Sequence, residues 1–272
     1  MIPNGIRTKW VAGKPVINGW LSIASPFAAE IMAEQGYDSL TIDLQHGLVG
    51  YEAATTMLQA MRASGVTPMV RVPWLDPADI MKALDAGAYG IICPMINNRE
   101  EAARLVSYMR YPPDGQRSFG PTRVNFSAGA DYGTHANSQV LALAMIETAE
   151  AFANLDAIVA TPGLDGVYVG PSDLTLGLTG HKYPSGFDRE EPEMVEAIQR
   201  ILKASHKASI RAALHCGTPA YAAKAIGWGF DLVTLSNDVR LLAGAAQASV
   251  SSVRKLLGEQ AAPPASSVAG GY

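Results

Sequence analysis

Polar side chains that could do chemistry stand at or just after the ends of several apolar runs: His46, Arg71, Glu147, Asp173 and Asn237. Glu147 closes the run LALAMIE, and Asp173 follows VYVG in the motif GPSD. If these runs are neighbouring parallel strands, the two carboxylates converge with room for water, which suits a hard cation such as Mg²⁺ or Mn²⁺. The alternative is a helix cap for Asp173 and a surface charge for Glu147.

The other two residue types suit proton transfer and oxyanion stabilisation. Arg71 ends the run TPMVRV and could hold a carboxylate or an enolate oxygen, with a structural ion pair as the alternative. His46, in DLQHG, could act as an acid or base near neutral pH, although a lone histidine is often structural. Asp85 falls in the last turn of a predicted helix, where a carboxylate opposes the helix dipole unless it meets a cation. Pairing with His46 would supply that cation.

Residue types that are missing from key places narrow the chemistry further. No lysine occupies a strand-like run, so no candidate for a Schiff-base amine is evident. No GxGxxG or GxxxxGKS loop follows such a run, and no His/Cys cluster has zinc spacing. A metal route to an enolate is therefore favoured, and neither a nucleotide cofactor nor a structural zinc is expected.

The elements that must position these residues repeat along the chain. Eight short apolar or alternating runs are each followed by a segment with helical spacing, which is typical of parallel strands joined by crossover helices. Eight such units predict an α/β fold, a closed (β/α)8 TIM barrel, as one domain over residues 1–258. The predicted strands are 17–23, 39–45, 67–72, 90–96, 140–147, 164–170, 210–216 and 230–235, and the clearest predicted helices are 26–35, 51–64, 76–86 and 99–108.

Two connections are too long to be simple turns, residues 111–139 and 174–190. Connections beyond roughly 12–15 residues usually carry function or are disordered. We expect both on the side of the barrel where strands end, because barrels place their active sites there. Residues 259–272 are small, rich in Pro and Gly and aperiodic, which predicts a disordered tail.

Composition limits the class of partner. Of 272 residues, 48% are hydrophobic and 17% are charged, so a large core can form, and the aliphatic runs are too short to cross a membrane. A net charge of -4 without a Lys/Arg cluster argues against nucleic acid or an anionic membrane as partner and favours a small molecule. Residues 1–19 show no secretory signal, so the expected location is cytoplasmic. Cys93 and Cys216 lie in strand-like runs, which suits buried reduced thiols.

Six motifs, DLQHG, MVRVPWLDP, LDAGAYGIICPM, YPPDGQRSFGP, AMIET and GLDGVYVGPSDL, together resemble the HpcH/HpaI aldolase family. The likeness runs from about Trp20 to the helix after Asn237, and its nearest branch is the hydroxy ketoacid aldolases, class II pyruvate aldolases. It implies a TIM barrel of the phosphoenolpyruvate/pyruvate type that binds one divalent ion, Mg²⁺ or Mn²⁺ with Co²⁺ or Zn²⁺ as alternatives. It also implies that a pyruvate or hydroxypyruvate enolate and an aldehyde are joined to, or released from, a 4-hydroxy-2-oxo acid.

The resemblance also implies residue roles and an assembly. Glu147 and Asp173 would bind the metal, Arg71 would be the catalytic arginine, and His46 would be a base in a dyad with Asp85, within one subunit or across a subunit boundary. The 2-oxo acid would contact Trp20 at the mouth, Arg71, and the GPSD turn, which consists of Gly170, Pro171, Ser172 and Asp173. The N–H groups of Ser172 and Asp173 would hold its carboxylate. The expected assembly is a homo-hexamer in which the last helix packs on a neighbour, and the apolar residues of 237–257 independently favour an oligomer.

One position departs from the family pattern. Many members carry Gln two residues before the metal-binding Glu, where this chain has Met145. Strand alternation places Met145 on the same side as Glu147, so a thioether would replace an amide donor and acceptor near the substrate. Hydroxypyruvate could then bind as well as pyruvate. Simple packing is the alternative, since Met often fills irregular gaps.

Three other functions remain open at this stage. Related barrels use the same metal–enolate chemistry to decarboxylate oxaloacetate or to cleave acyl-CoA esters, but a CoA substrate favours basic residues around the mouth and this chain has few. A non-catalytic barrel that binds a metabolite or assembles with itself is disfavoured by the convergence of His, Arg, Glu and Asp at strand ends.

Overall fold

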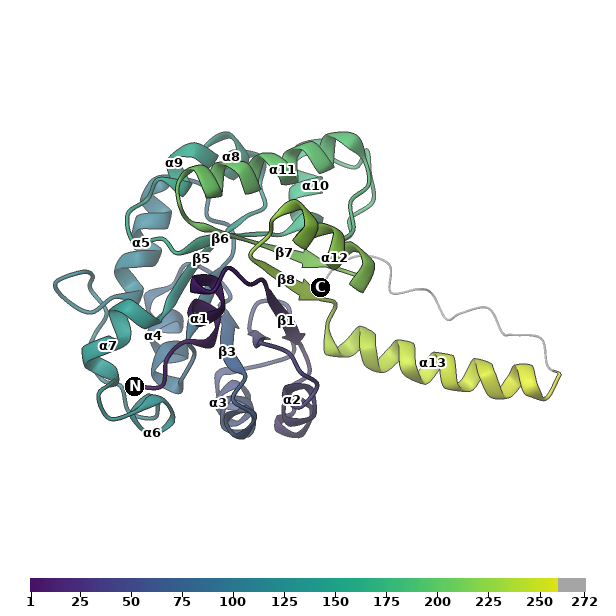
Figure 1. The fold of residues 1–272 in the computed structure, drawn as a ribbon, viewed down its shortest axis with the longest axis horizontal. Coiled ribbons are helices and arrows are strands. Elements are labelled where there is room, and N and C mark those ends of the chain that lie inside the picture. The colour runs from purple at the N-terminus through teal and green to yellow at the C-terminus, as the bar shows by residue number, and fades with distance from the viewer. Residues whose placement is uncertain (259–272) are drawn as a thin grey trace.

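The computed structural model describes residues 1–258, and its strands form a closed barrel surrounded by helices (Figure 1). Each strand pairs in parallel with the next along the chain, and β8 closes the barrel by pairing with β1. The predicted TIM barrel is therefore confirmed. The strands are β1 (Val16–Leu21), β2 (Ser39–Asp43), β3 (Thr67–Arg71), β4 (Gly90–Cys93), β5 (Leu141–Ile146), β6 (Gly166–Val169), β7 (Arg211–Cys216) and β8 (Leu232–Leu235).

All eight predicted strands are present, but most end earlier than the apolar runs suggest. The reason is that a residue just after a barrel strand is still buried, so the apolar run continues beyond the last residue of the strand. Inside and outside alternate as predicted in β5, where Leu143 and Met145 join the cluster within the barrel while Ala144 and Ile146 pack against the helices.

Half of the described helices begin at a side-chain cap, such as Asp76, which accepts hydrogen bonds from the N–H groups of Ala78 and Asp79. The helices that cover the barrel are α1 (Gly5–Val11), α2 (Pro26–Ala33), α3 (Tyr51–Ala60), η1 (Met61–Ser64), α4 (Pro77–Ala86), α5 (Arg99–Met109), α6 (Val124–Ala128), α7 (Tyr132–Gln139), α8 (Ala149–Ala153), α9 (Leu155–Val159), α10 (Pro171–Thr179), α11 (Pro192–Lys207), α12 (Pro219–Trp228) and α13 (Asp238–Leu256). No described helix is both long enough and apolar enough to span a membrane.

Helix α1, which the sequence patterns did not predict, closes the end of the barrel where the strands begin (Figure 1). Asn4 caps it, and Ile6 and Trp10 are buried in the cluster that fills the barrel interior. The interior is thus a packed core at this end, and the opposite end is left for the site. Cys93 and Cys216 are free and buried, as expected.

The connection at residues 111–139 lies at the end of the barrel where the strands begin, so our expectation for it was wrong. It follows a helix, α5, rather than a strand, and a helix in this fold runs back from the strand ends. Its contacts confirm the location: Arg117 pairs with Asp85 at the end of α4, and the carbonyl of Ala128 accepts from the N–H of Ile2.

The connection at residues 174–190 lies where it was expected, although its first part belongs to helix α10. The ring of Phe187 stacks on that of His215 in β7 at 4.3 Å between centroids. Asp188 accepts hydrogen bonds from the N–H of Gly217 and the hydroxyl of Thr218, just after the same strand ends. This connection therefore covers part of the end where the site residues lie.

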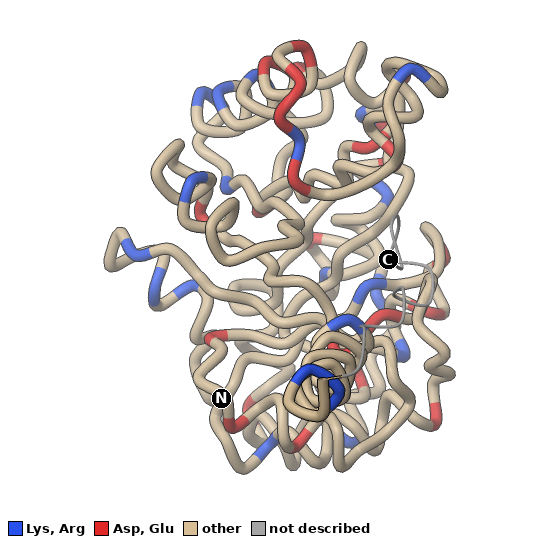
Figure 2. Tube along the Cα trace, turned by 90° about the vertical axis from the view of Figure 1, so that its right-hand side faces the viewer, with Lys and Arg blue, Asp and Glu red and all other residues tan. Residues whose placement is uncertain are grey.

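Helix α13 extends away from the barrel in Figure 1, and of its residues only Asp238 is buried. Basic and acidic residues are interspersed over the rest of the molecule in Figure 2, which looks toward this helix. Large apolar side chains of the helix and its end are exposed, namely Val239, Leu241, Leu242, Val250, Val253, Leu256 and Leu257. The predicted tail at 259–272 lies outside the described residues.

Candidate active site

A buried ion pair between Asp43 and Arg71 lies where strands β2 and β3 end. Each is the last residue of its strand, the two are register partners, and both side chains are fully buried. Nε of Arg71 donates to Oδ1 of Asp43 at 2.8 Å, and Nη2 donates to Oδ2 at 2.7 Å. Burial alone would raise the pKa of Asp43, but the hydrogen bonds and charge of Arg71 outweigh it and hold the pKa below its usual value.

Sequence reasoning placed Arg71 correctly and missed Asp43. The signal was present, because Asp43 stands in a strand-like run at an inward-facing position, where a carboxylate requires a buried partner. We predicted that this strand runs to residue 45, which treated Asp43 as strand interior and drew attention to His46 alone.

Trp20 supports this ion pair from within the barrel. Its indole N–H donates to Oδ2 of Asp43 at 3.2 Å, and the guanidinium carbon of Arg71 lies 4.8 Å from the ring centroid. The side chain is fully buried in the interior cluster. Trp20 is therefore buried beneath the mouth and fixes the position of the pair above it, and its contact with substrate stays a prediction.

His46 lies in the bend that follows β2, and its side chain is exposed. Its backbone N–H is oriented by Oδ1 of Asp43 at 3.3 Å. Desolvation and then the charge of Arg71 lower the pKa of the imidazole, against the opposing charges of Asp43 and Asp173. A neutral imidazole at neutral pH, close to an arginine and two carboxylates, can accept a proton.

Glu147 directly follows β5 and is 2% exposed. Its Oε1 accepts a hydrogen bond from the N–H of Met95 at 2.8 Å, which anchors the carboxylate to the segment after β4. Burial, reinforced by the charge of Asp173, raises its pKa to about 7, although Arg71 opposes the shift. A second positive charge at this place would relieve the unfavourable burial.

Asp173 lies in the first turn of α10, directly after β6, as the GPSD motif predicted. Gly170 is the N-cap and makes no side-chain cap, and Pro171 starts the helix. The N–H groups of this turn have no partner within the helix itself, and the helix dipole favours an anion there. The buried hydroxyl of Ser172 has no hydrogen-bond partner among the described residues. This turn has the polar groups that a carboxylate ligand requires.

A divalent cation fits the pair of carboxylates. Glu147, Asp173 and His46 each follow a strand at the same end of the barrel, and the charge of Asp173 acts on the pKa of both other groups. Among the described residues, no group of three or more His, Cys, Asp or Glu side chains could hold a metal ion. Mg²⁺ is commonly held by one or two carboxylates with water and substrate oxygens completing its shell, so two carboxylates suffice.

Asp85 does not meet His46 within this chain. It lies in the last turn of α4, at the end of the barrel where strands begin, and its Oδ1 accepts from Nη2 of Arg117 at 2.5 Å. Burial raises its pKa even though Arg117 opposes the shift. The reasoning that a carboxylate in a last helical turn needs a cation was correct, but the cation is Arg117.

Met145 and Asn237 are also in their expected elements. Met145 is fully buried inside the barrel, one inward-facing position before Glu147. This burial favours packing as its role, and direct contact with substrate stays a prediction. Asn237 caps α13 by accepting from the N–H of Arg240 at 2.8 Å, which accounts for its position after β8.

Comparisons with known proteins agree with this geometry. Residues 17–244 match the family model described as HpcH/HpaI aldolase/citrate lyase. A protein named hydroxypyruvate/pyruvate aldolase from Rhizorhabdus wittichii is 43% identical over 253 residues, which cover 93% of this chain and 100% of that protein.

Two further relatives extend the comparison. A 4-hydroxy-2-oxo-heptane-1,7-dioate aldolase from Salmonella dublin is 34% identical over 250 residues, which cover 90% of this chain and 92% of that protein. The crystal structure of an HpcH/HpaI aldolase/citrate lyase family protein from Burkholderia cenocepacia superposes with a TM-score of 0.81 at 34% identity, covering 88% of this chain and 95% of that one.

Proposed function

Since this chain belongs to the HpcH/HpaI aldolase/citrate lyase family and is a carbon–carbon lyase of the aldolase type, we propose that it is a class II aldolase. Its substrates would be 4-hydroxy-2-oxo acids, which it cleaves to an aldehyde and pyruvate or hydroxypyruvate, or forms from them. The single observation that carries the proposal is that four charged or titratable residues at one end of the barrel interact electrostatically: Asp173 and Arg71 both act on Glu147 and on His46.

Glu147 and Asp173 would hold one divalent cation, with Mg²⁺ or Mn²⁺ as the first choice because both ligands are hard oxygen donors. A bound cation would act as a Lewis acid on the ketone oxygen of the substrate and so make the adjacent C3–H bond more acidic. The raised pKa of Glu147 supports this assignment, since a cation would stabilise the ionised carboxylate.

The turn at the start of α10 would bind the substrate carboxylate. The N–H groups of Ser172 and Asp173 lie at a helix N-terminus, and anions bind favourably at such ends. The buried Ser172 hydroxyl provides a further donor. This contact would fix the 2-oxo acid so that its ketone faces Arg71 and the two carboxylates.

Arg71 would stabilise the enolate oxygen that forms when the C3–C4 bond breaks. The buried pair with Asp43 holds two guanidinium nitrogens in fixed positions, so the positive charge requires no reorganisation during the reaction. The charge of Arg71 helps to lower the pKa of His46 and opposes the rise in the pKa of Glu147, which supports a position of Arg71 close to both.

His46 would transfer the proton at the C4 hydroxyl. In the cleavage direction the neutral imidazole accepts that proton, the C4–O bond becomes the carbonyl of the aldehyde, and the electrons of the C3–C4 bond pass into the enolate. In the synthetic direction it returns the proton to the new alkoxide. The lowered pKa of His46 supports this role, because it keeps the imidazole unprotonated at neutral pH.

The assay that tests the proposal is cleavage of a 4-hydroxy-2-oxo acid with and without a chelator. We expect chelation to abolish turnover and added Mg²⁺ or Mn²⁺ to restore it. Glu147→Gln and Asp173→Asn should each lower kcat by a factor of about 100 or more, which is the usual effect of losing one contact to the transition state, while the fold persists.

The exposed Glu150, three residues after Glu147, offers a matched control. Glu150→Gln should keep full activity. Borohydride added with substrate should trap no adduct, since no lysine acts as a nucleophile. Full turnover in chelator, or a trapped adduct, would rule out the class II assignment.

A further inference from the structure

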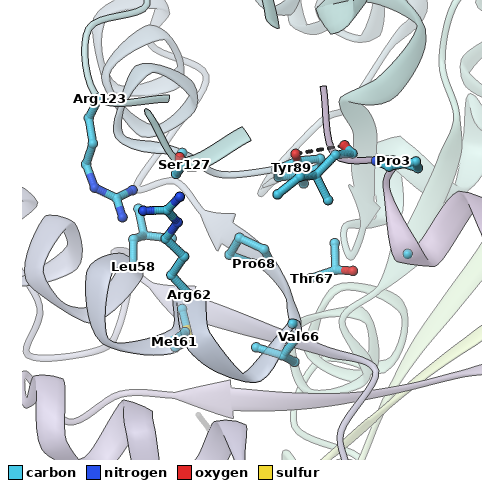
Figure 3. A pocket seen from close by; sticks show the side chains of 14 residues that line it. Pro3, Leu58, Met61, Arg62, Val66, Thr67, Pro68, Tyr89, Arg123 and Ser127 are labelled. Atoms are coloured by element: carbon cyan, nitrogen blue, oxygen red, sulfur yellow. Dashed lines mark hydrogen bonds between the residues drawn. The ribbon is translucent and has the colours of Figure 1, made fainter. Parts of the chain in front are cut away.

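A pocket lies at the end of the barrel opposite the candidate active site, between the start of β3, the segment before β4, and helix α6 (Figure 3). Its volume is about 130 Å³. We call it the N-terminal-end pocket. The residues that line it include Leu58, Met61, Val66, Pro68, Tyr89, Arg62, Arg123 and Ser127. None of these belongs to the site described above.

The walls of this pocket are apolar on one side. Leu58 and Met61 come from α3 and η1, Val66 directly precedes β3, and Pro68 lies in β3. The ring of Tyr89 closes the far side, and its hydroxyl donates to the carbonyl of Ile2 at 2.9 Å, which Figure 3 shows as a dashed line. Since that hydroxyl is already used, the tyrosine presents mainly its ring.

Two arginines stand at the other side, and their guanidinium groups point toward one another in Figure 3. The charge of Arg62 acts on Arg123, and burial together with this like charge lowers the pKa of Arg123. Among the described residues, no ion pair joins Arg62 or Arg123 to an acidic side chain. Two facing cations without an anion repel each other, and a bound anion would remove that repulsion.

The position of Arg123 is fixed by the backbone around it. Nη1 donates to the carbonyl of Ala86 at the end of α4. A Cβ atom on Gly87, which has a φ of 114°, would lie 2.6 Å from Nη1 and 3.0 Å from the Ser127 hydroxyl. The absence of a side chain at this left-handed position therefore leaves space for the guanidinium and the hydroxyl side by side.

The size and lining of the pocket define a class of ligand. An apolar cavity of roughly 150 Å³ accommodates a benzene ring, whereas drug-sized ligands occupy roughly 300–1,000 Å³. The apolar side therefore fits a body of about one ring or a short aliphatic chain. The two arginines match a carboxylate attached to that body, and the Ser127 hydroxyl, which donates to the carbonyl of Val124 at 3.4 Å, lies beside them.

We propose that the N-terminal-end pocket binds a small organic carboxylate, with its apolar body against Leu58, Met61, Val66 and Pro68 and its charge between Arg62 and Arg123. This is a binding site separate from the aldolase chemistry, because the strands that line it begin here and reach the proposed active site only at their other ends.

Titration with benzoate, followed by ligand-observed NMR, tests the proposal on the full chain with Mg²⁺ and saturating pyruvate present. Pyruvate occupies the proposed active site, so the remaining signal reports other sites. Any tag belongs at the C-terminus, since Ile2 and Pro3 line the pocket. We expect saturable binding of benzoate and at least tenfold weaker binding of neutral benzamide, because only the carboxylate relieves the repulsion between the arginines.

Arg62→Gln should weaken benzoate binding at least tenfold and leave aldolase turnover unchanged, since Arg62 is exposed and remote from the mouth. Arg104→Gln, on an exposed arginine of α5, is the matched control and should bind as the unmodified protein does. Hexanoate is the second probe for an aliphatic body. The proposal fails if neither probe binds, if benzamide binds as well as benzoate, or if Arg62→Gln binds benzoate normally.

Discussion

At the scale of single residues, the Asp43–Arg71 pair shows how this barrel keeps a charge ready for chemistry. Both side chains are fully buried, and removing two charges from water costs several kcal/mol per ion unless geometry and hydrogen bonds offset it. The offset comes from two parallel hydrogen bonds and from the indole of Trp20. A pair of this kind positions a functional group and need not add stability.

Removing one partner should therefore be worse than removing both. Asp43→Ala leaves a buried guanidinium without its counter-charge, and we expect a loss of about 3–5 kcal/mol in the free energy of unfolding measured with urea. The double variant Asp43→Leu with Arg71→Met should recover most of that loss, because no charge stays buried. Both proteins should be inactive.

Glu196 in α11 provides the control, since Glu196→Ala removes an exposed carboxylate and should change stability by less than about 0.5 kcal/mol. If Asp43→Ala were as stable as this control, or the double variant less stable than Asp43→Ala, the cost of a buried unpaired guanidinium would not govern the stability of this site.

At the scale of elements, strands β6, β7 and β8 are joined inside the barrel by a polar network. The hydroxyl of Tyr168 donates to Thr234 at 2.7 Å and lies 3.0 Å from Nδ1 of His215, and all three side chains are buried. His215 also stacks on Phe187 and packs at 4.9 Å between ring centroids against Trp20. Strand β7, which carries His215, is thereby connected to Trp20, the residue that supports the Asp43–Arg71 pair.

This network makes stability depend on pH. Burial, followed by the charge of Arg71, lowers the pKa of His215 to about 3, although Asp43 opposes the shift; Arg240 also lowers it. The unfolded chain binds a proton at this residue below about pH 6.5, and the folded chain does so only near pH 3. The stability contributed by the neutral imidazole is therefore complete above about pH 6.5 and is lost as pH falls below it.

We expect the protein to lose about 2 kcal/mol more unfolding free energy than His215→Gln between about pH 7.5 and about pH 5. Urea unfolding across this range measures both, and groups common to the two proteins cancel. His181→Gln replaces an exposed histidine and should follow the unmodified protein. Parallel curves for all three proteins would show that His215 titrates normally when folded.

The sequence predicted the strands and helices well, but it did not predict correctly at which end of the barrel each long connection lies. Periodicity located the eight strands and the inward face of β5, because burial on one face repeats every second residue. It also placed Asp85 in a last helical turn. The misplacement of residues 111–139 and of a His46–Asp85 dyad within one chain has one cause: a helix returns the chain to the end where strands begin, and a prediction based on strand ends ignores that return. A dyad between two subunits stays a prediction.

At the scale of the whole molecule, α13 is the part that a single barrel does not explain. Seven large apolar side chains on it and just after it are exposed, from Val239 at 42% to Leu256 at 86%. Large apolar side chains exposed in such number on one helix usually indicate an interaction surface. Together with the resemblance to hexameric aldolases, this supports a homo-oligomer, and we propose a hexamer in which α13 packs on a neighbouring subunit.

Light scattering with size-exclusion chromatography tests the assembly. We expect a homogeneous oligomer, and we expect the double variant Leu242→Asp with Val253→Asp to shift it toward monomers, since two charges would be buried in the interface. Ser249→Asp adds a charge to the same helix at an exposed polar position and serves as the control. A fully active monomer of the unmodified protein would exclude the hexamer.

The location of residues 111–139 has a consequence for laboratory evolution. This segment contacts α1, the end of α4 and the segment before α1, so mutations in it change the surroundings of Asp85 and Arg123 and do not reach Glu147 or His46 of the same chain directly. A library confined to it should vary heat resistance with aldehyde preference largely constant. A library in residues 180–190, which include Phe187 and lie against the end of β7, should vary aldehyde preference while heat resistance stays largely constant. Selection for a new acceptor aldehyde and selection for durability can therefore be run on separate parts of the gene and then combined.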